Sequence, residues 1–555
     1  MGGSTCVLTF DIGTTGVKTC LMHIDGRVTA VASAYAGYGL NVFDNGGAEQ
    51  DPDEWWAAVC ATAREALDKA GTPANDVAAV SFCSQMQGLV LVDETGRAVR
   101  PAMSYMDSRA RSQHERGIAG GLCIGGMNAS KLLRFLLITR AVPASVKDPV
   151  WKYAWVKENE PEVFSRVYKW LDVKEYLIAR LTGNFLMTEG SAYATLLMDT
   201  RGGARRWSRA LCRLFGVDMR HLPQIIRSTD IAGEITERAA AELGLAPGTK
   251  VYGGGGDAEL IGVGAGSMQP GDTHIYLGTS GWVSTVTDRQ VVDVSSLIAS
   301  IVGPSPGYYH YFAEMETAGK CLEWVRDHLA LDEIGVYLEK RNVTESLEAV
   351  YSSLYDYLCE VVGRVPAGSG GVIFTPWFHG NRCPFEDEHA RGMFFNIGLE
   401  TGKSMLIRAV IEGICYHCRW MLEAQQKKVR TSNPIRFVGG GAASPVICQI
   451  LADVLGLDIV TVDAPQNVGA VGAAVVIAAG MGLIGSVSEA AGLVPESRRF
   501  HPNAAHRAVH ERNYTVFKRL YKDNKQSFSR LNRDKRRAET EDCHGKDTGQ
   551  WGAVR

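Results

Sequence analysis

The chain has 555 residues, too many for one hydrophobic core, so at least two large domains are expected. Its 46% hydrophobic and 21% charged residues are ordinary values for a globular protein. The net charge of -3, without aromatic residues interleaved among Lys and Arg, argues against nucleic acid as a partner and favours small molecules.

The apolar runs and the cysteines indicate whether the chain could cross a membrane or bind a metal ion. The longest apolar runs, such as AVVIAAGMGLI from Ala474, are shorter than the ~20 residues that span a bilayer, and the N-terminus lacks a signal pattern. Among 13 scattered cysteines, the close pair Cys415 and Cys418 faces no second pair, so reduced structural thiols are expected rather than zinc. We therefore expect a cytoplasmic protein without membrane contact, and leave open whether it forms a homodimer.

A glycine-threonine loop follows the first predicted strand. The stretch FDIGTTGVKTC, residues 10–20, lies between an apolar β-prone segment and one with alternating apolar residues, which predicts strand, loop and strand. A phosphate loop of the G-x-x-x-x-G-K-[ST] kind must open a helix, so the hairpin context excludes it. Taken alone, this loop is more typical of an ordinary turn than of a phosphate site.

The same pattern returns in the second half of the chain. IYLGTSGWVSTV, residues 275–286, matches it position by position, with Gly278 lying 265 residues after Gly13 (278 minus 13). This offset predicts two similar halves, each with a glycine-hydroxyl hairpin loop. The backbone N–H groups and hydroxyls of two such loops can hold phosphates from both sides of a cleft.

The two copies differ in charge. Asp11 and Lys18 of the first copy become Tyr276 and Val283 in the second. We therefore expect charged chemistry on the first loop only, where Asp11 could hold Mg²⁺ through water and Lys18 could neutralise phosphate.

A run of four glycines ends on Asp257, before a predicted helix of small residues. The ordinary explanation is a helix N-cap, for which aspartate is a preferred residue. A cap does not require four glycines, however, and such a run suits backbone that lies against a ligand. An aspartate there is ionised near neutral pH unless desolvated, so it could accept the proton of an attacking hydroxyl.

A third glycine segment, GGGAASP, separates a predicted strand at 435–438 from a helix that Ser444 caps and Pro445 opens. Two explanations stay open on spacing alone: tight packing of strand on helix, or an opening that admits a flat adenine. The small-residue segment at 468–480 predicts a helix built for close approach.

Ten segments together resemble the FGGY family of carbohydrate kinases, in the superfamily of actin, sugar kinases and heat-shock ATPases. Any one is weak evidence, but ten in family order are highly specific. They are FDIGTTGVK, EQDPDEWW at Glu49, CSQMQG at Cys83, MDSR at Met106, LDVKEYLIARLTG at Leu171, GGGDAELIGVGAG, LGTSG, ETAGKCLEW at Glu316, RAVIEG at Arg408 and GGGAASP.

The resemblance implies an α/β protein of two ribonuclease-H-like domains, with ATP, Mg²⁺ and a sugar in the cleft between them. It makes Asp257 the general base and Asp11 the magnesium-associated carboxylate. It assigns further residues to ATP: Thr14, Thr15 and Lys18 in the first phosphate motif, Gly278 and Thr279 in the second, and Gly319, Gly441 and Ala442 beside ADP.

Residues on the sugar side depart from the family pattern. Family members of the xylulose kinase type carry Met-His where this chain has Met86-Gln87, and glycerol kinases carry Arg-Glu. Ala258 follows the expected base where relatives have asparagine or glutamine, so Glu259 or a water would have to replace a hydrogen bond to the sugar.

Two further motifs are ambiguous. Asp107 and Arg109 match the family's W-x-D-x-R, with Tyr105 in place of tryptophan, and are candidate sugar contacts; a surface ion pair is the ordinary alternative. Trp55 and Trp56 are more typical of a core than of a sugar platform, after the helix start at Asp51-Pro52.

The segment GAGSMQPGD at 264–272 is the expected boundary between a first domain at 1–266 and a second at 267–500. Rotation of the domains should close the cleft on its ligands and expel water. A C-terminal helix is expected at 501–533, and the tail at 534–555 is expected to be disordered because it lacks an apolar face.

The leading hypothesis is ATP-dependent phosphorylation of a terminal hydroxyl of a small ketose, first of all D-xylulose. One alternative is a kinase of another polyol or ketose: ribulose, glycerol, a tetrulose or a signalling sugar. The other is a nucleotide-binding sensor on the same fold, in which an aspartate after the glycine run would have no purpose.

Overall fold

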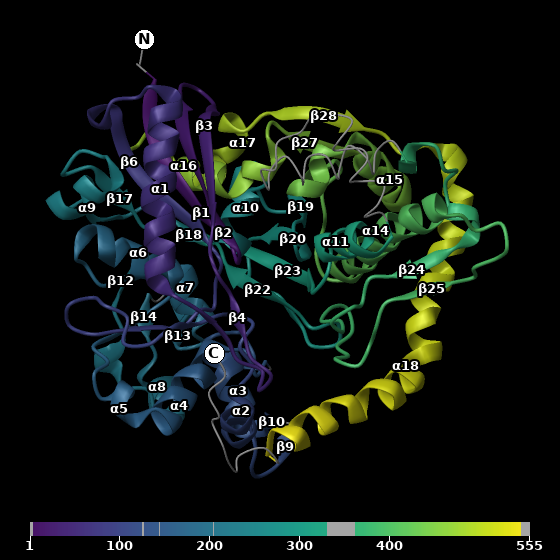
Figure 1. Cartoon of the computed structure of the whole chain (residues 1–555), viewed down its shortest axis with the longest axis horizontal. Coiled ribbons are helices and arrows are strands. Elements are labelled where there is room, and N and C mark those ends of the chain that lie inside the picture. Colours follow the sequence, from purple (N-terminus) through teal and green to yellow (C-terminus); the bar gives the residue numbers. More distant parts are fainter. Residues whose placement is uncertain (1–3, 125–126, 144, 204, 330–360, 545–555) are drawn as a thin grey trace, which may run out of the picture.

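Two large mixed sheets, each covered by helices, form the body of the molecule (Figure 1). This computed structural model describes residues 4–124, 127–143, 145–203, 205–329 and 361–544. The first sheet has the order β16-β17-β6-β1-β2-β3, with β18 also paired to β6. Its strands are β1 (Thr5–Ile12), β2 (Gly16–Ile24), β3 (Val28–Gly37), β6 (Val77–Ser84), β16 (Ile231–Glu234), β17 (Lys250–Tyr252) and β18 (Gly255–Gly256).

The second sheet has the order β21-β22-β23-β20-β19-β26-β27-β28. Its strands are β19 (Thr273–Leu277), β20 (Gly281–Thr287), β21 (Val292–Asp293), β22 (Ile298–Val302), β23 (Tyr309–Met315), β26 (Ile435–Val438), β27 (Ile459–Val462) and β28 (Glu496–Phe500). Shorter strands are β4 (Asn41–Val42), β5 (Ala48–Gln50), β7 (Val90–Val92), β8 (Ala102–Met103), β9 (Cys123–Ile124), β10 (Met127–Asn128), β11 (Lys169–Leu171), β12 (Leu186–Thr188), β13 (Met198–Asp199), β14 (Arg206–Trp207), β15 (Gln224–Ile226), β24 (Ile373–Thr375) and β25 (Met393–Phe395).

The two sheets repeat one topology. In the first, β1, β2 and β3 run antiparallel in succession, and β1 pairs in parallel with β6. In the second, β19, β20 and β23 run antiparallel in succession, and β19 pairs in parallel with β26. Each sheet continues with one more parallel and one more antiparallel neighbour, β17 and β16 or β27 and β28. The two similar halves predicted from the glycine loops are therefore confirmed.

Helices cover both sheets and connect their strands. Asp51 caps the first of them by accepting a hydrogen bond from the N–H of Asp53 at 2.9 Å, and Trp55 and Trp56 are buried, so these tryptophans belong to the core. The helices are α1 (Pro52–Ala70), α2 (Arg111–Ile118), α3 (Ala129–Ile138), α4 (Pro149–Asn159), α5 (Pro161–Phe164), α6 (Val173–Thr182), α7 (Glu189–Ala194), α8 (Arg209–Phe215), α9 (Glu237–Leu243), α10 (Asp257–Gly264), α11 (Gly319–His328), α14 (Lys403–Gln426), α15 (Pro445–Leu455), α16 (Val468–Gly480), α17 (Ala490–Leu493) and α18 (Arg507–His544).

Helices α10 and α16 join the two halves. α16 belongs to the second half of the chain but packs against α10 and against β1 and β6 of the first sheet. The backbones approach so closely that a Cβ atom on Gly264 would lie 1.8 Å from the carbonyl oxygen of Val468, and one on Gly472 would lie 2.2 Å from that of Leu260. The small residues predicted for close approach are thus the ones that permit this crossing.

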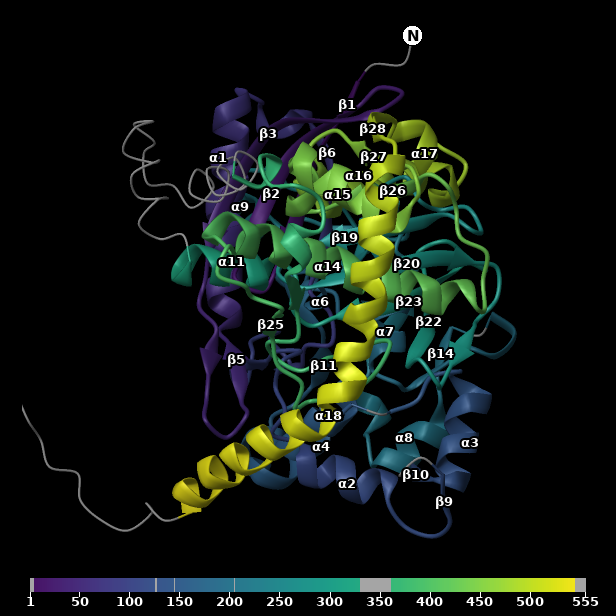
Figure 2. The same ribbon diagram turned by 90° about the vertical axis from the view of Figure 1, so that its right-hand side faces the viewer.

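The last helix, α18, runs along the outer side of the second half (Figures 1 and 2). Tyr514, Phe517 and Leu520 are buried in the core of that half, as their spacing predicted. The helix continues beyond the expected end at 533 as far as His544, and the rest of the predicted disordered tail lies outside the described residues. Of the helices in the described ranges, none has the length and apolar character needed to cross a membrane.

Candidate active site

The first glycine loop connects β1 and β2 as a tight hairpin. The N–H of Gly13 donates to the carbonyl oxygen of Gly16 at 2.9 Å. Two side chains brace the loop from behind: the Tyr38 hydroxyl donates to the Gly13 carbonyl oxygen at 2.5 Å, and the Gln50 amide donates to the Thr14 carbonyl oxygen at 2.8 Å. Thr15 is exposed and Thr14 partly so, which leaves both threonines at the surface of a rigid turn.

Asp11 and Lys18 lie opposite each other on β1 and β2. The Asp11 carboxyl also contacts Cys83 and packs against α16, where a Cβ atom on Gly469 would lie 2.3 Å from Oδ2. Burial raises the pKa of Asp11, while the charge of Lys18 and a hydrogen bond from Cys83 act to lower it. Lys18 reaches toward the second half, where its Nζ lies 3.4 Å from the carbonyl oxygen of Gln466.

The second glycine loop connects β19 and β20 and is braced by the start of α11. The N–H of Gly278 donates to the carbonyl oxygen of Ser280 at 3.0 Å, and the N–H of Gly319 donates to that of Gly278 at 2.8 Å. A Cβ atom on Gly319 would lie only 2.4 Å from the Gly278 carbonyl oxygen. Gly319 therefore allows α11 to begin directly against the loop that contains Thr279.

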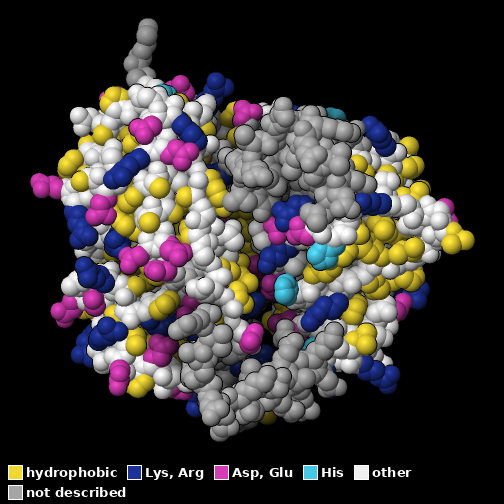
Figure 3. Space-filling model, in the orientation of Figure 1, with side chains coloured by type: hydrophobic (Ala, Val, Ile, Leu, Met, Phe, Trp, Pro, Cys, Tyr) yellow, Lys and Arg dark blue, Asp and Glu magenta, His cyan; other side chains and the backbone are white. Residues whose placement is uncertain are grey.

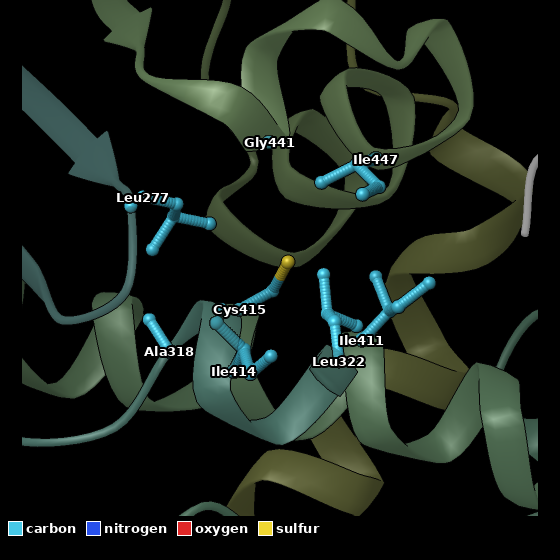
Figure 4. A pocket seen from close by; sticks show the side chains of 10 residues that line it. Leu277, Ala318, Leu322, Ile411, Ile414, Cys415, Gly441 and Ile447 are labelled. Atoms are coloured by element: carbon cyan, nitrogen blue, oxygen red, sulfur yellow. The ribbon is translucent and has the colours of Figure 1, made fainter. Parts of the chain in front are cut away.

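An apolar pocket opens beside this second loop (Figure 4). It brings together Gly278, which the family resemblance assigned to the second phosphate motif, with Gly319 and Gly441, which the resemblance placed beside ADP. Ala442 is buried next to them in a 3₁₀ turn. The remaining lining is contributed by Leu277, Ala318, Leu322, Ile411, Ile414, Cys415 and Ile447.

In the third glycine segment one residue serves tight packing and another lines the pocket, while the admission of an adenine stays a prediction. Gly439 has φ 92°, and a Cβ atom there would lie 2.5 Å from the Leu277 carbonyl oxygen, so it serves tight packing. Gly441 instead lines the pocket. Ser444 caps α15 as predicted, by accepting a hydrogen bond from the N–H of Ile447 at 3.3 Å.

Asp257 is the first residue of α10, and Gly256 rather than Asp257 occupies the cap position. The preceding glycines allow close contacts: a Cβ atom on Gly254 would lie 2.2 Å from the Phe82 carbonyl oxygen, and one on Gly256 would lie 2.0 Å from the Met86 sulfur. The Asp257 side chain is partly exposed, and its Oδ1 accepts a hydrogen bond from the N–H of Ala258 at 2.8 Å.

Charges from both halves act on Asp257. The pKa of Asp257 is raised to about 7, mainly by burial of its carboxyl; Asp11, Glu314 and Asp172 act in the same direction, and the hydrogen bond from Ala258 acts in the opposite one. Glu314 lies on β23 of the second sheet, whereas Asp11 lies on β1 of the first. Figure 3 shows a hollow between the two halves, with charged and histidine side chains along it. The Asp257 carboxyl is therefore influenced by charges from both halves of the chain.

Sugar-side candidates lie at different depths. Met86 packs on Gly256, immediately before the aspartate, and Gln87 is partly exposed. Tyr105 replaces the family tryptophan and brings its hydroxyl within 3.3 Å of the Thr14 hydroxyl. Glu259 is 1% exposed, and a contact from it to the sugar in place of the one that Ala258 lacks stays a prediction.

Asp107 and Arg109 form a buried network rather than a surface ion pair. Asp107 is 0% exposed and accepts hydrogen bonds from the N–H of Ala48 at 2.9 Å and from Arg109 Nη2 at 2.7 Å. Arg109 also binds Glu49 at 2.5 Å and stacks over the Trp155 ring at 4.6 Å. With its oxygens occupied, Asp107 holds Arg109, and a sugar contact by Asp107 itself remains a prediction.

Sequence reasoning missed three buried polar residues around the site. Cys83 contacts Asp11, while Lys152 and Asp172 bind the backbone beside Gln87. Cys83 and Asp172 belong to two of the family segments but carried no expected role, and Lys152 lies outside those segments. Their roles could not be predicted from local sequence, because their partners are backbone groups or residues distant in the chain.

Comparisons with known proteins agree with this geometry. The N-terminal domain model of the FGGY family of carbohydrate kinases matches residues 6–264, and the C-terminal domain model matches 274–481. The xylulose kinase of Lactococcus lactis subsp. lactis (strain IL1403) is 30% identical over 522 residues, 94% of this chain and 97% of that protein. The gluconokinase of Bacillus subtilis (strain 168) is 26% identical over 462 residues, 83% of this chain and 85% of that protein. The solved structure of a ligand-bound xylulose kinase from Lactobacillus acidophilus is similar with a TM-score of 0.79 at 25% identity, covering 95% of this chain and 99% of that one.

Proposed function

Because the chain belongs to the FGGY family of carbohydrate kinases, we propose that it transfers the γ-phosphate of ATP to a terminal hydroxyl of a small ketose, with D-xylulose as the first candidate. Relatives named as xylulose kinases support this sugar, and the gluconokinase relative makes a sugar acid the second candidate. The observation that carries the proposal is Asp257, a partly exposed carboxyl under the influence of charges from both halves.

In this proposal Asp257 is the general base that accepts the proton of the attacking sugar hydroxyl. A base is most effective when its pKa is near the working pH, which fits a value of about 7. The loops around Thr14 and Thr279 would contact the phosphates with backbone N–H groups and hydroxyls, and Lys18 would neutralise phosphate charge. The apolar pocket beside Gly319 and Gly441 suits the flat apolar faces of adenine.

Asp11 fits the magnesium ion that such kinases need. Its carboxylate is an oxygen ligand of the type that Mg²⁺ prefers. Within the described residues, no group of three or more His, Cys, Asp or Glu is arranged to hold a metal ion, so we expect phosphate oxygens and water to supply the remaining ligands. Bound there, Mg²⁺ would neutralise charge on the transferred phosphoryl group. The use of ATP and a free sugar suits the cytoplasm, and a homodimer remains a prediction.

A coupled ADP-release assay tests the proposal. The panel contains D-xylulose, D-ribulose, glycerol, D-gluconate and an aldose, each with ATP and Mg²⁺. We expect D-xylulose to stimulate ADP release most strongly. If only another compound of the panel stimulates ADP release, that compound replaces D-xylulose as the proposed substrate, and the proposed kinase function stands. ATP binding without stimulation by any sugar would overturn the kinase and favour a nucleotide sensor.

A further inference from the structure

We infer that Lys152 and Asp172 are positioning residues for sugar recognition, because together they clamp the backbone of Gln87 beside the proposed base. This inference rests on the proposed kinase function and deepens it. It assigns recognition of the sugar to the side-chain amide of Gln87. This amide is neutral and both donates and accepts hydrogen bonds, so it suits a neutral polyhydroxy substrate.

Asp172 holds the N–H side of the clamp. It precedes α6, and its side chain is 4% exposed. Its Oδ2 accepts a hydrogen bond from the N–H of Gln87 at 2.9 Å, and its Oδ1 accepts from the N–H groups of Gly88 at 2.9 Å and Val173 at 2.8 Å. One carboxylate therefore joins the start of α6 to two consecutive residues of the sugar-side turn.

Lys152 holds the carbonyl side. It lies on α4 with 0% of its side chain exposed. Its Nζ donates to the carbonyl oxygen of Gln87 at 2.8 Å and to that of Ser104 at 2.7 Å. No described carboxylate forms a direct ion pair with it, and burying a lysine for two backbone carbonyls is costly. Ser104 immediately precedes Tyr105, so the same ammonium group sets the distance between the two turns that carry Gln87 and Tyr105.

The backbone of Gln87 needs such a clamp. Its φ is 63°, a left-handed conformation that is unfavourable for a non-glycine residue. No described residue forms a hydrogen bond with its side-chain amide, which is partly exposed. The neighbouring Met86 touches Gly256, the residue before Asp257. A left-handed backbone held at both N–H and C=O, in a residue whose side-chain amide is not used by the protein and whose neighbour Met86 contacts Gly256, is the arrangement expected of a residue that recognises a ligand.

A double-mutant cycle tests this inference with the sugar that gives the highest turnover. Lys152→Met removes the carbonyl clamp, and Gln87→Gly removes both the amide and the need for a clamp, since glycine accepts this φ without strain. Each single variant should raise the sugar KM about tenfold, the effect of about one lost hydrogen bond, and leave the ATP KM within about twofold. The double variant should raise the sugar KM no further than Gln87→Gly alone, because Lys152 acts through Gln87.

Lys157→Met is the matched control. Lys157 lies on the same helix and also donates to a backbone carbonyl, that of Gly216 at 2.8 Å, but it is exposed and remote from the turn. Its sugar KM should not change. Asp172→Asn provides a second variant, expected to raise the sugar KM, if Lys152→Met does not fold.

Additive effects in the cycle, equal increases in the ATP and sugar KM values, or unchanged sugar KM in Gln87→Gly and Asp172→Asn would overturn the inference while the kinase function stands. Absence of sugar-dependent turnover in the unmodified protein would instead overturn the proposed function and this inference with it.

Discussion

The two glycine loops occupy equivalent places in the two sheets, but they differ in strand pairing and in side-chain chemistry. In the first, Ile12 pairs with Val17 across the loop, so Asp11 faces Lys18. In the second, Leu277 pairs with Gly281, one residue earlier than the sequence match suggests. Tyr276 therefore faces Trp282, and their rings stack with centroids 4.1 Å apart.

This difference separates two tasks that one nucleotide requires. The first loop carries a carboxylate and an ammonium group, which suit metal ions and phosphate charge. The second carries no charge at the matching positions and opens instead onto an apolar pocket. The duplicated hairpin thus supplies similar backbone N–H donors in both halves, while charged side chains are placed at the matching positions of the first half only.

The largest loss of activity is expected outside both loops, at Asp257, the proposed base. Asp257→Asn should lower kcat about 10³-fold with little change in the ATP KM, because it removes proton acceptance but keeps the shape. Steady-state assays of ADP release measure both values. Asp51→Asn is the matched control, since Asp51 also begins a helix, and asparagine caps equally well. A comparable loss in the control, or an active Asp257→Asn, would contradict this role.

Removing the negative charge of Asp11 in the first loop is expected to cause the second-largest loss of activity. Asp11→Asn is expected to lower kcat about 10²-fold and to raise the Mg²⁺ concentration needed for half-maximal rate, because it removes a carboxylate ligand. The matching change in the second loop, Tyr276→Phe, should alter kcat less than about twofold. Equal losses of kcat in Asp11→Asn and Tyr276→Phe, measured in Mg²⁺ titrations, would contradict the assignment of charged chemistry to the first loop only.

The pH dependence of kcat/KM for the sugar tests the proposed role of Asp257 as the base. Asp257 must be ionised to accept a proton, and its pKa is about 7. The rate should therefore rise with pH and level off above about 7, with a value at pH 6 about tenfold below the plateau. A profile that is flat from pH 5 to 8 would exclude a base with this pKa.

A smaller effect is expected from the brace of the second loop. Gly319→Ala places a methyl group 2.4 Å from the Gly278 carbonyl oxygen and must shift either the loop or α11. The ATP KM should rise about fivefold while the sugar KM stays unchanged, since the sugar-side turn belongs to the first half. Kinetics with each substrate varied in turn test this. Equal changes in both KM values would mean that the loop is not specific to the nucleotide.

The smallest effect concerns stability. Burial raises the pKa of Glu259 to about 8, with Glu175 and Asp257 acting in the same direction and Lys174 in the opposite one. Between about pH 4.5 and 8 the unfolded state therefore binds fewer protons than the folded state at this residue, so its contribution to stability falls as pH rises. Glu259→Gln should raise the melting temperature by about 2 °C at pH 8 and hardly at all at pH 5. A larger increase in the melting temperature at pH 5 than at pH 8, measured by calorimetry, would contradict a Glu259 carboxyl that is buried in its neutral form.

Much of the fold could be predicted because repetition is a strong signal. The matched loops at Gly13 and Gly278 predicted two similar halves, and both loops are hairpins in equivalent places of the two sheets. The small residues of α16 predicted close approach, and Gly472 makes such an approach to α10. These features are local in sequence, so residue type and spacing reveal them.

Features that depend on distant partners could not be predicted. The spacing of W-x-D-x-R did not show that Asp107 is fully buried, because Ala48 and Glu49, which complete its network with Arg109, come from another strand. Lys152 and Asp172 bind main-chain atoms, which leave no mark on the residue types of their partners.

The most direct measurement is a crystal structure with a non-hydrolysable ATP analogue, Mg²⁺ and D-xylulose. We expect the phosphates to lie between the loops of Thr14 and Thr279, the adenine to lie in the pocket beside Gly319, and a terminal sugar hydroxyl to lie within about 3.2 Å of the Asp257 carboxylate. Phosphates bound by one loop alone, or a sugar whose hydroxyls all lie far from Asp257, would contradict this expectation.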